Sequence, residues 1–240
     1  MTLTGSRTPP PGSARALPAL RPHAWTAAGA LGLLVLARLA MVVWQFRLHD
    51  ETAAYIPKSE REEGYHPPLT SLEQTYHWLD DAYTVTLLLS VLAFLLWLRR
   101  ARDNADVLAP GAQRYRRMWL LLGWFVPVVA LWFPRGIVVD VWRAGARGGL
   151  APEERRTPWY VNVWWLLWLW STVASGTGLA QDDTEAVDQV HTAFGSALLN
   201  DVVIIVAAGF AALVVLALSR DQDEVTAPGR RGVPGGTEGD

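Results

Sequence analysis

The sequence predicts an all-α integral membrane protein, a bundle of four transmembrane helices with a proline-broken segment that is re-entrant or interfacial. Apolar residues make up 51% of the 240 residues and gather in runs of about 20, the length that crosses a hydrocarbon core of about 30 Å. Many of the 13 tryptophans lie at the ends of these runs, where the membrane–water interface suits them. Arginines are concentrated in two of the connecting loops, which is typical of a membrane protein with a defined orientation.

Four apolar runs are long enough to cross the bilayer. The first is too long for the apolar region of a typical signal peptide, so we interpret it as an uncleaved transmembrane helix. Trp-rich sequence begins the third run, and the fourth is mostly aliphatic. The predicted spans are 24–46, 78–98, 159–180 and 192–219.

The transmembrane helical domain is therefore expected to cover residues 24–219. Residues 1–23 contain three consecutive prolines and small residues, and residues 220–240 are rich in glycine, proline and charge. Neither composition can build a hydrophobic core, so we expect a disordered N-terminal segment and a disordered C-terminal tail.

The segment 118–133 lies between the two arginine-rich loops, 99–117 and 134–158, which carry six and five arginines. Its 16 residues would extend about 24 Å as a helix, which is short for a crossing. Pro127 would kink a helix there. Because arginine is retained on the cytoplasmic side, we expect the segment to enter and leave the membrane on that side.

The other loops fit this threading. Loop 181–191 has four acidic residues and no lysine or arginine, and loop 47–77 has six acidic residues against three lysines and arginines. Both are expected outside, with the N- and C-termini in the cytoplasm. The alternative is five transmembrane helices, with 118–133 extended through 137–139 and the arginines of 134–158 outside.

Two local signals flank the segment. Ala109-Pro110-Gly111 is a turn signal within the first arginine-rich loop. After Pro134, an apolar stripe at helical spacing and a pairing of Asp140 with Arg143 at i+3 are typical of a helix lying in the plane of the interface. A short apolar linker can show such a stripe by chance.

Residues 80–218 resemble the bacterial membrane-protein family known as domain of unknown function 4328. The resemblance rests on Arg-Arg-Ala-Arg-x-Asn-Ala at 99–105, Trp-Phe-Val-Pro at 124–127, Leu-Trp-x-Pro at 131–134, Asp-Val-Trp-Arg at 140–143 and the tryptophans of 164–168. Members of that family usually carry asparagine where this chain has Ala130, which argues against polar chemistry at that position. The resemblance implies fold and location and supplies no activity. The motif and cytoplasmic-face residues are Arg99, Arg100, Arg102, Asn104, Trp124, Pro127, Trp132, Pro134, Asp140, Trp142 and Arg143.

Arg38 and Asp201 are the ionisable residues deepest within the predicted spans. A charge in the membrane is costly unless it finds a partner inside the bundle. Both residues lie about 12–14 Å below the outer face at 1.5 Å per residue, so we predict an ion pair between the first and last spans. The alternative is that Arg38 extends its side chain towards the interface, while Asp201 and Asn200 line a small polar pocket.

The arginine-rich inner face admits two interpretations. Retention of positive charge in the cytoplasm explains the arginines without any ligand, whereas anionic lipid headgroups would also attract them. Asn104 is uncharged, so retention does not explain it, and a capping role at the inner end of the second helix is expected.

The sequence favours a non-enzymatic protein with a structural, scaffolding or sensing role, because it contains no recognisable catalytic constellation. The alternative is a small transporter or channel component that uses Arg38 and Asp201. No catalytic residue, metal ligand or cofactor is predicted. Of 21 basic residues only Lys58 is lysine, which suggests a GC-rich bacterial gene, so the bacterial plasma membrane is expected. The expected partner is the lipid bilayer, and no nucleic acid is expected to bind. The sequence leaves open whether anionic lipid headgroups bind and whether the chain forms a homo-oligomer. It identifies no protein partner.

Overall fold

The computed structural model describes residues 17, 19–59, 70–126, 128–146, 151–178 and 187–226. Within this part of the chain every regular element is helical. Five are α-helices of 12 residues or more, and the connection between the second and fifth α-helices contains the shorter ones. In chain order they are α1 (Arg21–Ser59), α2 (Thr70–Leu108), α3 (Trp119–Phe125), η1 (Val129–Leu131), α4 (Phe133–Ala144), η2 (Pro152–Glu154), α5 (Trp159–Gly178) and α6 (Val187–Thr226).

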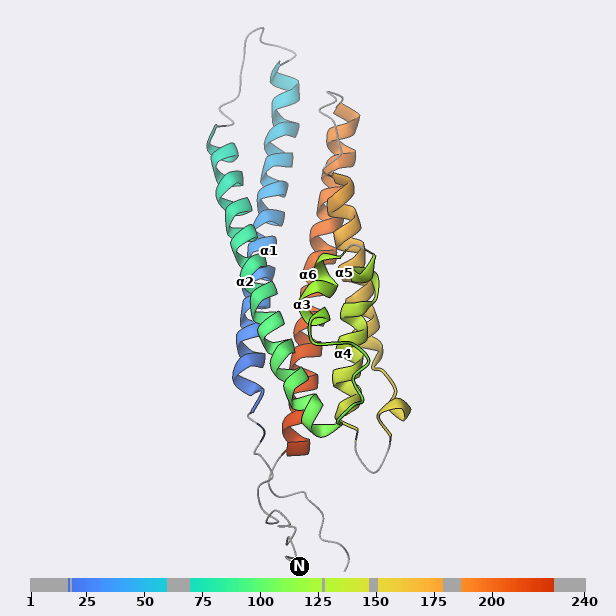
Figure 1. Cartoon of the computed structure of the whole chain (residues 1–240). Helices are drawn as coiled ribbons and strands as arrows, with labels where there is room; N and C mark the ends of the chain where they lie inside the picture. The colour runs from blue at the N-terminus through green and yellow to red at the C-terminus, as the bar shows by residue number, and fades with distance from the viewer. Residues whose placement is uncertain are drawn as a thin grey trace, which may run out of the picture.

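The long helices run side by side (Figure 1). α1 packs along both α2 and α6, and α5 packs along α6. The start of α1, the end of α2, the start of α5 and the end of α6 all lie at the same, lower end of the bundle in Figure 1. We call this the basic end, because Arg21, Arg99, Arg100, Arg155 and Arg220 lie near it.

Three of the described helices are long and apolar enough to cross a membrane: Arg21–Asp50, Gln74–Leu108 and Phe194–Val225. The described part of the chain is therefore all-helical, with three candidate membrane-spanning helices. The helix α5 has 20 residues, of which five are tryptophan.

The long helices exceed the predicted spans. Each apolar run is extended by polar turns that lie beyond the hydrocarbon length, so a 39-residue helix is about 58 Å long. At the basic end, α1 begins at Arg21 and Leu20 is fully buried. α6 continues to Thr226, with Gln222 buried inside the bundle. Residues 21–23 and 220–226, which the sequence analysis assigned to the terminal segments, are thus parts of α1 and α6. Of the other terminal residues only 17, 19 and 20 are described, so the expected disorder of the rest lies outside the described part.

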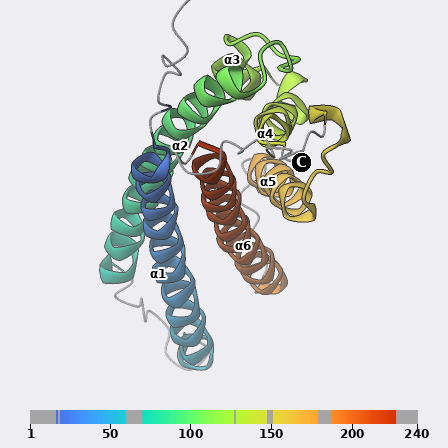
Figure 2. The same ribbon diagram turned by 90° about the horizontal axis from the view of Figure 1, so that it is seen from below.

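The proline-broken segment forms a short helical hairpin. α3 leads away from the basic end, the chain turns through η1, and α4 returns to it (Figure 1). In the view of Figure 2, the hairpin fills the space between the end of α2 and α5. α4 contacts α2, α3 and α5. Pro134 stands in the first turn of α4, where a missing backbone N–H costs no helical hydrogen bond.

α4 is a buried helix, which corrects the interpretation of 134–145 as a helix in the plane of the interface. Eight of its 12 residues are buried, and the apolar stripe of Ile137 and Val141 is fully covered. Val139 and Asp140 are each 3% exposed, and Arg135 and Arg143 are half-buried, so α4 has no fully exposed polar side. The amphipathic pattern arises because α4 packs into the bundle between neighbouring helices.

The predicted turn at 109–111 is confirmed. Ala112 donates its N–H to the carbonyl of Ala109 at 3.2 Å, and Gly111 has a φ of +80°. Glycine adopts this left-handed conformation at no steric cost, as the third residue of such a turn requires. The turn sends the chain back along α2 towards α3.

We expect Gly136→Ala to destabilise the hairpin, because the added methyl carbon would lie 2.7 Å from the ring of Tyr115. Tyr115 is held against Phe133, with ring centroids 4.5 Å apart, so it cannot move freely. Overpacking of this kind lowers the free energy of unfolding by about 1–3 kcal/mol, measured by denaturant titration in detergent.

The matched control is Gly209→Ala in α6, where nothing lies within 4 Å of the added atom. This change is expected to raise the free energy of unfolding by about 0.5–1 kcal/mol through helix propensity alone. Equal effects of the two substitutions would contradict the close approach of α4 to Tyr115.

Candidate functional site: a buried ion pair and an arginine junction

The predicted pair of Arg38 with Asp201 is confirmed. Nη1 of Arg38 donates to Oδ1 of Asp201 at 2.8 Å, joining α1 to α6. The side chains are 13% and 3% exposed. The alternative in which Arg38 extends away from the bundle is therefore wrong.

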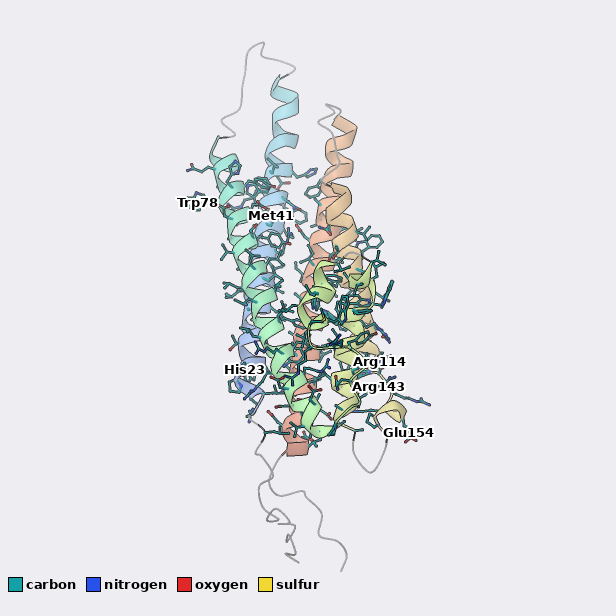
Figure 3. The ribbon with its side chains drawn as sticks, in the orientation of Figure 1. His23, Met41, Trp78, Arg114, Arg143 and Glu154 are labelled. Carbon is teal, nitrogen blue, oxygen red and sulfur yellow. The ribbon has the colours of Figure 1, made fainter. Side chains whose placement is uncertain are left out.

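Two further residues complete this site. Gln45, two turns along α1, donates Nε2 to Oδ2 of Asp201 at 2.8 Å. The guanidinium carbon of Arg38 lies 3.3 Å from the centre of the Tyr83 ring of α2, a cation–π contact. The pair thus connects α1, α2 and α6. Met41, labelled in Figure 3, lies one turn along α1 and marks the level of the site in the upper half of the bundle.

The position of the pair follows from the packing stripes of the two helices. On α1, Ala27, Leu31, Leu34 and Met41 are buried at intervals of three, four and seven residues, and Arg38 occupies the same stripe. Asp201 likewise continues the buried stripe of α6. Each charge therefore points into the helix–helix contact, where the other one is its partner.

Three polar atoms near this site lack a hydrogen-bond partner among the described residues. They are Nε of Arg38, Oε1 of Gln45 and Oδ1 of Asn200, all buried. Asn200 precedes Asp201 on α6 and is half-buried. Buried water commonly satisfies such atoms in proteins.

A second polar region lies at the basic end. We call it the arginine junction and define it as Arg102, Arg114, Asp140, Arg155 and Asp221. Figure 3 shows Arg114 close to α4 in the lower half of the bundle. These residues come from α2, the 109–118 connection, α4, the segment before α5, and α6.

Arg155 makes the most extensive contacts of the junction. Its Nη1 and Nη2 donate to the two carboxylate oxygens of Asp221 at 2.8 and 2.9 Å. Nη1 also donates to the carbonyl of Trp142 at 2.7 Å, and the guanidinium lies 3.9 Å from the Trp142 ring centre. This arginine therefore ties the end of α4 and the start of α5 to the last turns of α6.

Asp140 pairs with Arg114, which corrects the expected pairing with Arg143. Nε and Nη2 of Arg114 donate to Oδ1 at 2.9 and 2.8 Å, and the Arg114 backbone N–H donates to Oδ2 at 3.2 Å. The turn after α2 brings Arg114 over α4, a contact that spacing along one helix cannot reveal. The hydrogen bond to Asp140 raises the pKa of Arg114, so this arginine stays charged.

Arg102 is almost fully buried, at 4% exposed. Its Nη2 donates to the carbonyl of Tyr115 at 2.7 Å, and Nε donates to Asp106 at 3.3 Å. Asn104 is buried inside α2, four residues before the helix ends at Leu108, so its expected capping role is wrong. Helix α2 continues beyond the predicted end because its last turns pack against the hairpin and α6.

The remaining motif residues differ in how exposed they are and in what they contact. Arg99 is exposed, Arg100 and Arg143 are half-buried with a buried Nε, and Trp132 is 50% exposed. Trp124 joins an aromatic cluster with Trp165 and Trp168, at ring-centroid distances of 6.4 and 5.4 Å. Pro127 lies outside the described residues.

Several contributing residues were not anticipated from the sequence. Gln45, Tyr83 and Asp221 gave no strong signal, since each is an ordinary residue near the end of an apolar run. Asn162 gave a detectable one, because it interrupts the apolar start of α5. Its Oδ1 accepts from Nε and Nη2 of Arg135 at 2.9 and 2.6 Å, which joins α4 to α5.

Comparison with known proteins bears on this arrangement. The model of the family described as Domain of unknown function (DUF4328) matches residues 73–220. The chain belongs to this family. Searches of the curated proteins and of the solved structures found no match.

The DUF4328 match covers α2 to α5 and most of α6, including Asp201, Arg155 and Asp140. α1 precedes it, so Arg38 and Gln45 belong to a helix that the match does not include. The buried ion pair therefore joins α1 to the family domain. The family description supplies no activity, and the long apolar helices fit a membrane protein.

Proposed function

We propose that this protein is a non-enzymatic, four-span protein of the bacterial plasma membrane with a structural, scaffolding or sensing role. In this proposal α1, α2, α5 and α6 cross the membrane, and the α3–α4 hairpin enters and leaves on the cytoplasmic side. Both termini and the basic end face the cytoplasm.

The observation that carries the proposal is the position of the hairpin ends. α2 ends and α5 begins at the same end of the bundle, with α3 and α4 between them (Figure 1). Two arginine-rich connections thus meet at one end, which supports placing that end in the cytoplasm. Irregular backbone around η1 lies beside α4, as protein-covered backbone at membrane depth must.

The length and surface of α5 support a fourth crossing. Its 20 residues extend about 30 Å, which matches the hydrocarbon core. Leu166, Trp170 and Val173 are each more than half exposed, so α5 presents an apolar outer side. Trp159 at its start is 65% exposed, as an interfacial tryptophan would be.

The arginines of the basic end divide into two groups. Those of the arginine junction are engaged by protein and hold the hairpin in the bundle. The second group is exposed and provides candidates for lipid headgroups or cytoplasmic partners; it includes Arg21, Arg99, Arg116, Arg156 and Arg220. A scaffolding or sensing role would use this second group.

The alternative, a transporter or channel component, is favoured by the buried ion pair and its three unpartnered polar atoms. A transport path would need polar groups between this site and the basic end. Below Arg38, however, the α1–α6 contact is lined by buried apolar residues, including Leu34, Leu31, Ala208 and Ala211. This apolar column favours the non-transporting role.

Cysteine accessibility tests the proposed threading, because the sequence contains no cysteine. Single cysteines at Ala112, Gly148 and Gln181 are treated in intact cells with a maleimide reagent that cannot cross the membrane. We expect labelling at Gln181 alone, and labelling at all three positions once the cells are permeabilised.

The cysteine-free parent protein is the control and should stay unlabelled throughout. Labelling of Ala112 and Gly148 from opposite sides would overturn the hairpin in favour of five crossings. Labelling of both from outside would overturn the cytoplasmic assignment of the basic end.

A further inference from the structure

A groove of about 310 Å³ lies between the start of α1 and the end of α6. It is at the basic end, far from the buried ion pair, since Arg38 lies 17 residues, or about 25 Å, along α1 from Arg21. Its position within α1 and beyond residue 220 puts much of its lining outside the DUF4328 match. The lining residues are Arg21, Ala24, Trp25, Leu216, Ser219, Arg220, Asp223 and Glu224.

The floor of the groove is held by hydrogen bonds. Nε1 of Trp97 donates to Oγ of Ser219 at 2.8 Å inside the bundle. The backbone N–H of Leu20 donates to Oδ1 of Asp223 at 3.0 Å, which fixes the start of α1 against α6. The groove is thus part of the packed structure of both helices.

The charges of the groove are ordered along the bundle axis. On α6, Leu216, Arg220 and Glu224 follow at intervals of four residues, so they share one side of the helix about 6 Å apart. α1 runs in the opposite direction, so Trp25 lies on the side nearer the centre of the bundle and Arg21 lies at its start. From the bundle centre outwards the groove is therefore first apolar, then basic, then acidic.

The two guanidinium groups are available for a ligand. Arg21 and Arg220 are exposed, and neither forms an ion pair with any residue in the described ranges. Trp25 is 59% exposed and offers a ring at the edge of the groove. Guanidinium groups bind phosphate oxygens with good geometry, and carboxylates accept hydrogen bonds from a primary ammonium.

We propose that this groove binds the headgroup of a phospholipid that carries a phosphate and a terminal primary ammonium, that is, phosphatidylethanolamine. The lipid has the same order of groups as the groove: acyl and glycerol carbons, then phosphate, then ammonium. Trp25 and Leu216 contact the glycerol region, Arg21 and Arg220 bind the phosphate, and Glu224 receives the ammonium. The proposal rests on the proposed function only in assigning the lipid to the cytoplasmic leaflet.

Native mass spectrometry of the purified full chain in detergent tests this, with phosphatidylethanolamine, phosphatidylglycerol and phosphatidylcholine of equal chain length as probes. We expect phosphatidylethanolamine to bind most tightly. Glu224→Gln should weaken its binding about fivefold, the effect of about one charge near a membrane surface, without weakening phosphatidylglycerol binding. Arg220→Gln should weaken both lipids by a similar factor.

The matched controls are Glu154→Gln, which removes an exposed charge at the same end but outside the groove, and Arg47→Gln, which removes an exposed charge towards the other end of α1. Both should leave the lipid preference unchanged, and the thermal unfolding of all four variants should match the parent. Equal affinity for the three lipids, or equal effects of the groove and control variants, would overturn the proposal. If free phosphoethanolamine bound as tightly as phosphatidylethanolamine, the apolar end of the groove would contribute nothing, and the proposal would be overturned in favour of a soluble ligand.

Because the purified protein has no sidedness, this experiment is independent of the labelling in cells. A failure of the lipid preference would leave the proposed threading intact, and a failure of the threading would leave the lipid preference intact.

Discussion

Replacing Asp201 with leucine is expected to lower the free energy of unfolding by about 3–5 kcal/mol, the usual effect of removing one partner of a buried ion pair. The guanidinium of Arg38 would keep its contact with Tyr83 but lose the carboxylate that balances its charge. Gln45 would lose its acceptor as well. The measurement is reversible unfolding in mixed micelles, followed by far-ultraviolet circular dichroism.

The double variant Arg38→Leu/Asp201→Leu should recover most of this loss. Two leucines would continue the apolar stripes of α1 and α6, and apolar replacement of a whole buried pair is often neutral or stabilising. The coupling between the two positions is then read from the double-mutant cycle.

Asp81→Leu is the matched control, because Asp81 is an exposed carboxylate on α2. Its effect should stay within about 0.5 kcal/mol, as for most surface substitutions. If the double variant were as unstable as Asp201→Leu alone, the pair would not be the source of the effect. That result would assign Asp201 a role that does not depend on Arg38.

Replacing Asp221 with alanine is expected to lower the free energy of unfolding by about 3 kcal/mol, because Arg155 would be left largely buried without its partner. The loss should also be local. Hydrogen exchange at residues 151–156 should accelerate, since the bridge to α6 holds this segment.

Arg155→Lys distinguishes geometry from charge at the same site. Lysine keeps the positive charge but cannot make two parallel hydrogen bonds to a carboxylate or lie flat on the Trp142 ring. We expect it to recover less than half of the stability lost in Arg155→Ala. Arg156→Lys, at the exposed neighbouring position, serves as the control and should behave as the parent. If Arg155→Lys recovered all of the stability lost in Arg155→Ala, the positive charge alone would be sufficient to hold the segment.

The hairpin illustrates how far local sequence signals reach. The length of 118–133, its prolines and the arginines on both sides predicted a segment distinct from the long helices, and the structure breaks the chain there into α3, η1 and α4. The apolar stripe after Pro134, however, led us to expect α4 in the plane of the membrane interface, whereas it is buried in the bundle. An apolar stripe shows that one side of a helix is covered, but it does not distinguish lipid headgroups from neighbouring helices, and here α2 and α5 cover it.

The two polar sites also differ in how far the sequence predicted their pairing. Arg38 and Asp201 could be paired from sequence because each is a lone charge in a long apolar run at a similar depth, so few partners were available. Asp140 offered a partner on its own helix, and the sequence favoured Arg143. The structure instead gives it Arg114, 26 residues earlier, since the turn at Gly111 folds that connection over α4.

The sequence by itself determined the helical class, the approximate positions of the long helices and the buried pair between the first and last of them. These depend on hydrophobic length and on the cost of an isolated charge in an apolar environment, both of which are properties of the residues themselves. Only the tertiary structure decided where the helices end, what surrounds the hairpin and which arginines are engaged. Those features depend on contacts between segments distant in sequence, and their partners become neighbours only when the chain folds.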